Sequence, residues 1–170
     1  MIGTEELTDL MAHHVLERDR QELEFGDTLD IKTSIVLVVL TFLAGQAADS
    51  LRAIPKAGAG VICQYMAIIA LSLGGIFAVG ELWPRNYKIE ASPDRYDIWL
   101  SELKAHHEGE ENSDSKVVAA SIGGRIAMAK DRIHFNIDVN KRKSWWMTVS
   151  FFCTAGAFAL NLAALVSRLF

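Results

Sequence analysis

The apolar positions of this chain are pooled into three blocks, and nearly all charged positions lie before and between these blocks. Residues 33–48, 57–80 and 144–167 contain no Asp, Glu, Lys or Arg. The second and third blocks are each 24 residues long, which lets a helix cross a bilayer core of ~30 Å with some tilt. The pattern predicts an all-α integral membrane protein with three transmembrane helices.

The first block is the shortest, because its 16 residues form a helix of only about 24 Å. Lys32 can extend its ammonium group outward, and Leu29, Ile31 and Leu51 lengthen the apolar surface. We therefore expect a complete span rather than a re-entrant hairpin. A soluble helical bundle with very apolar core helices is the alternative for the whole chain, and the two long uncharged runs argue against it. A cleaved secretory signal is disfavoured, because residues 1–32 hold nine acidic residues.

The distribution of Lys and Arg predicts the orientation in the membrane. With three spans, residues 1–32 and 81–143 share one side and carry 14 of the 17 cations, whereas residues 49–56 and 168–170 carry three. The positive-inside rule then places the N-terminus and the large loop in the cytoplasm and the C-terminus outside. Trp83, Trp145 and Trp146 fall at the same predicted interface, and together with Lys141, Arg142 and Lys143 they are the expected interface anchors.

The polar segments predict further helices on the cytoplasmic side. Tyr96, Trp99, Leu100 and Leu103 recur at helical spacing, so a helix is expected over residues 93–106, and a second one over about 115–140. The first could lie on a membrane or bind a partner, or it could simply pack against the other cytoplasmic helices. We expect an acidic helical segment at residues 1–32, a first span at 33–48 and a short outer loop at 49–56. A second span at 57–80, a cytoplasmic helical region at 81–143, a third span at 144–167 and an outer tip at 168–170 follow. We expect the cytoplasmic helices to form a small bundle.

Composition and motifs give little support to an enzyme. The chain has 170 residues and a net charge of −4, so no nucleic-acid partner is expected. The histidine pairs at 13–14 and 106–107 lack the HExxH or i,i+4 spacing of a metal site, and Cys63 and Cys153 lie in apolar blocks. No nucleophile stands beside a base, so neither catalysis nor a cofactor is predicted.

Polar and small residues in and beside the spans are candidates for contacts between helices. The candidate polar contacts are Asp30, Lys32, Gln64, Asp138 and Asn161. Two rows of small residues allow close helix approach, within one protomer or between protomers, and they consist of Ala70, Gly74 and Ala78 and of Ala155, Ala159 and Ala163. Asp30, Lys32 and Asp138 could equally be ordinary flanking charges. No charge lies inside the three blocks, so a proton relay or an ion-coupled transporter has little support.

These features resemble the Pycsar transmembrane effector domain family of bacterial anti-phage signalling. The shared elements are Asp30-x-Lys32 at the first span, two spans joined by a short outer loop, Trp83-Pro84 with Tyr87 nearby, and Asn140-Lys141 before the last span. The resemblance implies a membrane effector that oligomerises or rearranges on an infection signal and impairs the inner membrane. In that family the signal is a cyclic pyrimidine nucleotide, and Arg85, Lys88, Arg125 and Lys141 to Lys143 are the cations available here to bind one.

The expected function is therefore a membrane-embedded effector or sensor, homo-oligomeric through its small-residue rows and in contact with the lipid bilayer. The rival hypothesis is a non-catalytic scaffold or accessory subunit, whose acidic N-terminal segment and cytoplasmic helices dock a soluble protein. A small channel or transporter subunit is a third possibility.

Overall fold

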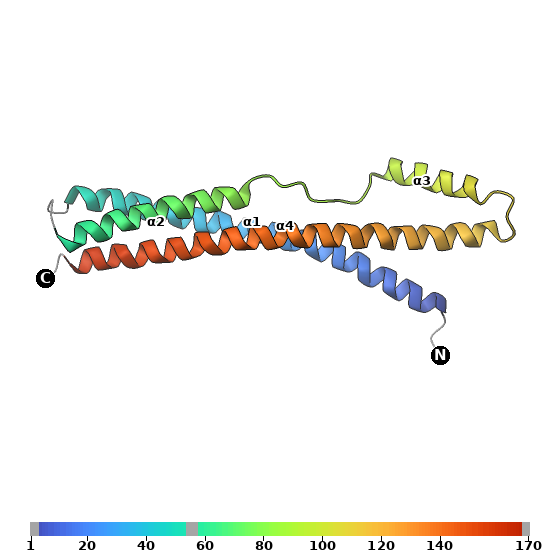
Figure 1. Ribbon diagram of the computed structural model, residues 1–170, viewed down its shortest axis with the longest axis horizontal. Coiled ribbons are helices and arrows are strands. Elements are labelled where there is room, and N and C mark those ends of the chain that lie inside the picture. The colour runs from blue at the N-terminus through green and yellow to red at the C-terminus, as the bar shows by residue number, and fades with distance from the viewer. Residues whose placement is uncertain (1–3, 54–57, 168–170) are drawn as a thin grey trace. The chain divides into compact units, whose positions relative to one another are not determined.

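The computed structural model of the chain describes residues 4–53 and 58–167, and over these ranges it contains four helices and no strand. The helices are α1 (Thr4–Ala53), α2 (Ala59–Leu82), α3 (Pro93–His106) and α4 (Ser113–Val166), as Figure 1 shows. α1, α2 and α4 are each long and apolar enough to cross a membrane. The prediction of an all-helical chain with three membrane-compatible helices is confirmed.

The chain divides into two compact units. Unit 1 consists of residues 1–24 and 86–139, and unit 2 consists of residues 25–85 and 140–170. α1 and α4 each contribute residues to both units without interruption. The helix expected at 115–140 is thus the first part of α4, which no proline interrupts.

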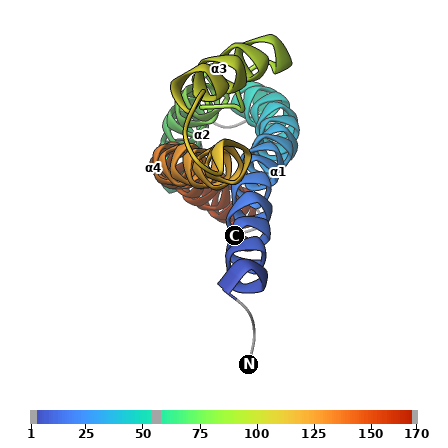
Figure 2. The ribbon, with the colours of Figure 1, turned by 90° about the vertical axis from the view of Figure 1, so that its right-hand side faces the viewer.

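The helices of unit 2 pack against one another through buried positions that recur every three or four residues. In α2 the buried residues are Gln64, Ala67, Leu71, Gly74, Ala78 and Glu81, a spacing of alternating three and four residues that is typical of coiled-coil seams. Ala47 of α1 and Ala157 of α4 join Leu71 and Ala78 in the same apolar core. Seen end-on in Figure 2, the three helices surround a common axis. Small residues at the contact allow this close approach.

Large apolar side chains of unit 2 point outward rather than into this core. They are found on all three helices and include Ile35, Val38, Phe42, Ile62, Met66, Ile69, Ile76, Phe151, Phe152, Phe158 and Leu162. Water-soluble proteins rarely expose apolar surface on this scale. A small and partly polar interior with a large apolar exterior suits helices that are surrounded by lipid.

Unit 1 is built around the first part of α4. Ser92 precedes α3, Pro93 occupies its first turn, and the Tyr96 amide donates to the Ser92 carbonyl at 3.1 Å, which is a favourable start for a helix. Tyr96, Trp99, Leu100 and Leu103, the apolar face expected from the sequence, are partly buried. A Cβ at Gly124 of α4 would lie only 2.7 Å from the Trp99 ring, so the α3 indole packs directly on the α4 backbone.

We expect Gly124→Val to loosen α3 from α4. Because the new side chain would overlap the Trp99 ring, the contact can form only after a shift that costs about 1–3 kcal/mol. Limited trypsin digestion should then cleave the stretch before α3 faster than in the wild type. Gly123→Val is the matched control, since a Cβ at Gly123 meets nothing within 4 Å. Equal cleavage of the two variants would contradict the packing.

Candidate functional site

A cluster of ionisable side chains lies inside unit 2, and we call Asp30, Glu81 and Lys143 the charged cluster. One residue comes from each of α1, α2 and α4. The Lys143 ammonium donates a hydrogen bond to Asp30 Oδ1 and lies 4.0 Å from Glu81 Oε1. The Lys143 side chain is 4% exposed and Glu81 is fully buried, whereas Asp30 is 43% exposed. The charged cluster therefore joins all three helices through mostly buried groups.

Buried polar groups surround the charged cluster. Thr33, one turn beyond Asp30, is fully buried, and Asn140, one turn before Lys143, is 2% exposed. Neither Glu81 oxygen has a hydrogen-bond partner, and neither does Thr33 Oγ1. Because an unpaired buried polar group costs free energy, this concentration of them makes the charged cluster the candidate functional site.

The charged cluster changes the interpretation of Lys143. The sequence predicts Lys141, Arg142 and Lys143 as anchors at the membrane surface, and Lys141 and Arg142 are indeed exposed. Lys143 instead points into unit 2, because its position on α4 falls on the same face as buried Ser150. Trp83 and Trp145 are exposed, and Trp146 is partly buried against Gly80 of α2.

A second polar contact lies farther along the same helices. Gln64 Nε2 of α2 donates to Asn161 Oδ1 of α4 at 2.9 Å and to the Ala47 carbonyl of α1 at 3.1 Å. The predicted polar residues Gln64 and Asn161 are thus brought together, as are Asp30 and Lys143. Lys32 and Asp138, the other two candidates, have exposed side chains.

We expect Gln64→Leu to destabilise unit 2 modestly. Hydrogen bonds between membrane helices contribute about 0.6–1.7 kcal/mol, and this substitution removes two of them and leaves Asn161 unpaired. Thermal unfolding in lipid micelles measures the change. Gln46→Leu is the control, because Gln46 is an exposed glutamine of α1. A Gln64→Leu variant as stable as the control would show that the contact does not hold the helices together.

Of the two predicted rows of small residues, the row on α2 lies on a packing face and the row on α4 is exposed. Gly74 and Ala78 are buried and Ala70 is partly buried, so this row lies on the packing face of α2, and the Ser150 hydroxyl donates to the Gly74 carbonyl at 2.8 Å. Ala155, Ala159 and Ala163 are all exposed on α4. The packing face of α4 is offset from them and carries Ser150, Thr154, Ala157 and Ala164. The second row therefore makes no close helix contact within the protomer.

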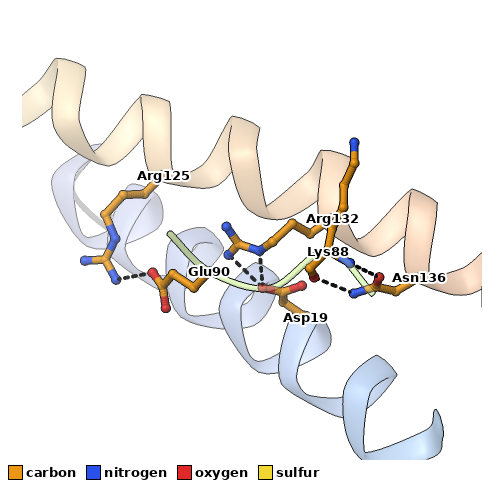
Figure 3. A network of polar contacts seen from close by, with 6 residues as sticks. All are labelled: Asp19, Lys88, Glu90, Arg125, Arg132 and Asn136. Carbon is orange, nitrogen blue, oxygen red and sulfur yellow. Dashed lines mark hydrogen bonds and ion pairs between the residues drawn. The ribbon is translucent and has the colours of Figure 1, made fainter. Parts of the chain in front are cut away.

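Unit 1 contains a different polar network, which fixes the extended stretch between α2 and α3 on α4. Asn136 Nδ2 donates to the Lys88 carbonyl and the Lys88 amide donates to Asn136 Oδ1, each at 3.0 Å (Figure 3). Lys88 Nζ donates to Asp131 Oδ2 at 2.7 Å, and this hydrogen bond lowers the pKa of the Asp131 carboxyl. The Asn136 amide group thus satisfies both the backbone N–H and the backbone carbonyl of Lys88, as a neighbouring β-strand would.

Three of the cations predicted to bind a ligand, Arg85, Lys88 and Arg125, are engaged within the chain. Lys88 pairs with Asp131, and Arg125 lies 3.8 Å from Glu90 and stacks over the Tyr96 ring. Arg85 belongs to unit 2, where its guanidinium donates to the Gly80 carbonyl at 3.2 Å. Each already has an acidic, aromatic or carbonyl partner, so an anionic ligand would have to displace these partners.

A buried ion pair joins α1 to α4 in unit 1. Arg132 Nε and Nη2 lie 2.8 and 2.7 Å from Asp19 Oδ2, and the two side chains are only 10% and 12% exposed (Figure 3). The second oxygen, Asp19 Oδ1, is buried and has no hydrogen-bond partner. Among the described residues no group of His, Cys, Asp and Glu side chains has the arrangement of a metal site.

Sequence reasoning missed four of these polar residues, namely Asp19, Glu81, Arg132 and Asn136. A signal for Glu81 was present, because it continues the row of Gly74 and Ala78 by three residues and so falls on the same helix face. Asp19 and Arg132 are 113 residues apart, and nothing local in the sequence pairs them.

Comparison with known proteins adds no relative. No protein-family model, no curated protein and no solved structure matches this chain.

Proposed function

We propose that this protein is a bacterial inner-membrane effector or sensor that perturbs the membrane in response to a cytoplasmic signal. The observation that carries the proposal is the charged cluster, which joins one residue from each of three membrane-compatible helices. Ionisable residues inside a membrane bundle are costly, and they mark pathways, relays and switches. A bundle held by ion pairs has a discrete arrangement that a signal can break.

The membrane placement rests on the sequence and on the outward apolar surface. The 14 to 3 distribution of Lys and Arg favours a cytoplasmic N-terminus and large loop, with the C-terminus outside. Unit 1 would then be the cytoplasmic part that receives the signal. Because α1 and α4 contribute to both units as uninterrupted helices, they supply a direct connection from unit 1 to the charged cluster.

Two further parts of the proposal concern oligomerisation and the trigger. The exposed row Ala155, Ala159 and Ala163 supports close contact with a second copy, since it is not used within the protomer. The resemblance noted above supports a cyclic pyrimidine nucleotide as the trigger and a role in antiviral defence. The internal pairing of Lys88 and Arg125 means that such a ligand would compete with Asp131 and Glu90.

A scaffold or accessory subunit is the second candidate, and surface residues of unit 1 favour it. Leu10, Met11, Ile98 and Val118 are large apolar side chains of unit 1 that are more than half exposed. Such residues are typical of surfaces that bind another protein. A scaffold would need these residues and would tolerate substitutions in the charged cluster that leave the fold intact.

The test is membrane potential in living bacteria. A voltage-sensitive dye should report depolarisation by the wild type when a cyclic pyrimidine nucleotide is supplied, and a weaker response from Asp30→Asn, which removes the charge paired with Lys143. Asp27→Asn is the matched control, because Asp27 is an exposed aspartate one turn earlier on α1. An unchanged potential in the wild type under both conditions, with insertion in the membrane verified, would overturn the effector and leave the scaffold.

A further inference from the structure

The charged cluster contains more acidic groups than basic ones. It contains two carboxyl groups and one ammonium, and the hydrogen bond from Lys143 is made to Asp30. The Glu81 carboxyl is fully buried and makes no hydrogen bond, and its only described cationic neighbour is that same ammonium, at 4.0 Å. If all three groups were ionised, the charged cluster would carry one uncompensated negative charge, and the Glu81 carboxylate would be fully shielded from water.

The side chains that face Glu81 from the neighbouring helices include one cation, Lys143, which already pairs with Asp30. From α1 it faces Asp30 and Thr33, and from α4 it faces Lys143. Arg85 lies just beyond the end of α2, four residues after Glu81, and its guanidinium donates a hydrogen bond to the Gly80 carbonyl. A buried carboxylate with no full ionic partner costs several kcal/mol, and proteins avoid this cost by neutralising the group.

We infer that the charged cluster is a proton-binding site in which Glu81 carries the proton while Asp30 and Lys143 remain an ion pair. The neutral acid has one O–H donor, and Thr33 Oγ1 is a buried oxygen that has no partner. A hydrogen bond from protonated Glu81 to Thr33 would satisfy both groups by rotation of the Glu81 side chain. The inference rests on the membrane placement proposed above but not on any effect on membrane potential.

Release of this proton would change how the helices are held. Ionised Glu81 would compete with Asp30 for Lys143, and the two carboxylates would repel each other, which weakens the α1–α4 ion pair. The charged cluster can therefore couple proton uptake to the packing of three helices. This role needs no partner protein and no nucleotide.

Infrared spectroscopy of the purified protein in lipid nanodiscs tests the inference. At neutral pH the wild type should show the carbonyl stretching band of a protonated carboxylic acid, and Glu81→Gln should lack it. Glutamine resembles the neutral acid in shape and polarity, so this variant should keep its fold, which circular dichroism verifies. Glu111→Gln, in an exposed turn, is the control and should retain the band. A band of equal intensity in Glu81→Gln would overturn the assignment.

A second measurement needs no variant. Labelling all glutamates with carbon-13 should shift the band in the wild-type protein, whereas labelling all aspartates should leave it in place. No band in the wild type, or a band that shifts only with labelled aspartate, would overturn the inference.

Discussion

Lys143→Met should lower the free energy of unfolding by about 3 kcal/mol. The substitution keeps the length of the side chain but removes the ammonium that bonds Asp30 and faces Glu81. The Asp30 carboxylate then loses its cationic partner, and the fully buried Glu81 carboxyl loses its neighbouring ammonium. Breaking a buried pair by removing one partner is costly because the remaining charge is not compensated. Thermal unfolding in lipid micelles, followed by circular dichroism, measures the loss.

Two comparisons separate this effect from a general loss of charge. Arg142→Met removes an exposed cation next to Lys143 and should change stability by less than about 0.5 kcal/mol. Combining Lys143→Met with Asp30→Asn and Glu81→Gln leaves no ionisable side chain in the charged cluster and should recover much of the loss, since neutral replacements of buried ion pairs are often tolerated. A Lys143→Met protein as stable as Arg142→Met would contradict the buried position of Lys143.

Arg132→Met should destabilise unit 1 by a similar amount, about 3–5 kcal/mol, because it leaves the Asp19 carboxylate buried without its partner. One Asp19 oxygen already lacks a hydrogen bond, so the carboxylate has no other described group to compensate it. Limited proteolysis measures the loss, with faster cleavage of α1 expected in the variant.

Lys130→Met is the matched control, since Lys130 is an exposed cation two residues earlier on α4. The double variant Asp19→Leu with Arg132→Leu should be more stable than Arg132→Met, because it leaves no unpaired charge. Additive losses in the double variant would mean that Asp19 and Arg132 act independently, and the ion pair would contribute nothing to unit 1.

The three apolar helices could be predicted because the signal for them is local. An uncharged run of 24 residues indicates a membrane-compatible helix without any knowledge of its neighbours. The helix over residues 93–106 follows from equally local features, namely Ser92-Pro93 at its start and one apolar face. The exposed and buried faces of α4 were harder to assign, because both Ala155-Ala159-Ala163 and the Ser150-Thr154-Ala157 face have small residues at helical spacing.

The candidate site could be predicted only in part, because the residues of the charged cluster lie just outside the ends of the three uncharged, apolar runs of the sequence. A charge beside an apolar block is usually a flanking charge, so the position of Glu81 and Lys143 beside a block does not single them out. Only the register of α1, α2 and α4 against one another shows that both side chains lie on packing faces. Gln64 and Asn161 could be singled out because a polar residue inside an apolar span is conspicuous by itself.

The most direct test of three membrane crossings is cysteine labelling in intact bacteria with a reagent that cannot pass the inner membrane. Single cysteines at Ser50, Glu111 and Ser167 would be compared in a chain with Cys63 and Cys153 replaced by serine. With three crossings, the cysteines at 50 and 167 should react from outside, and the cysteine at 111 should react only after the membrane is opened. Labelling at 111 in intact cells, or release of the protein from membranes by alkaline carbonate, would contradict this topology.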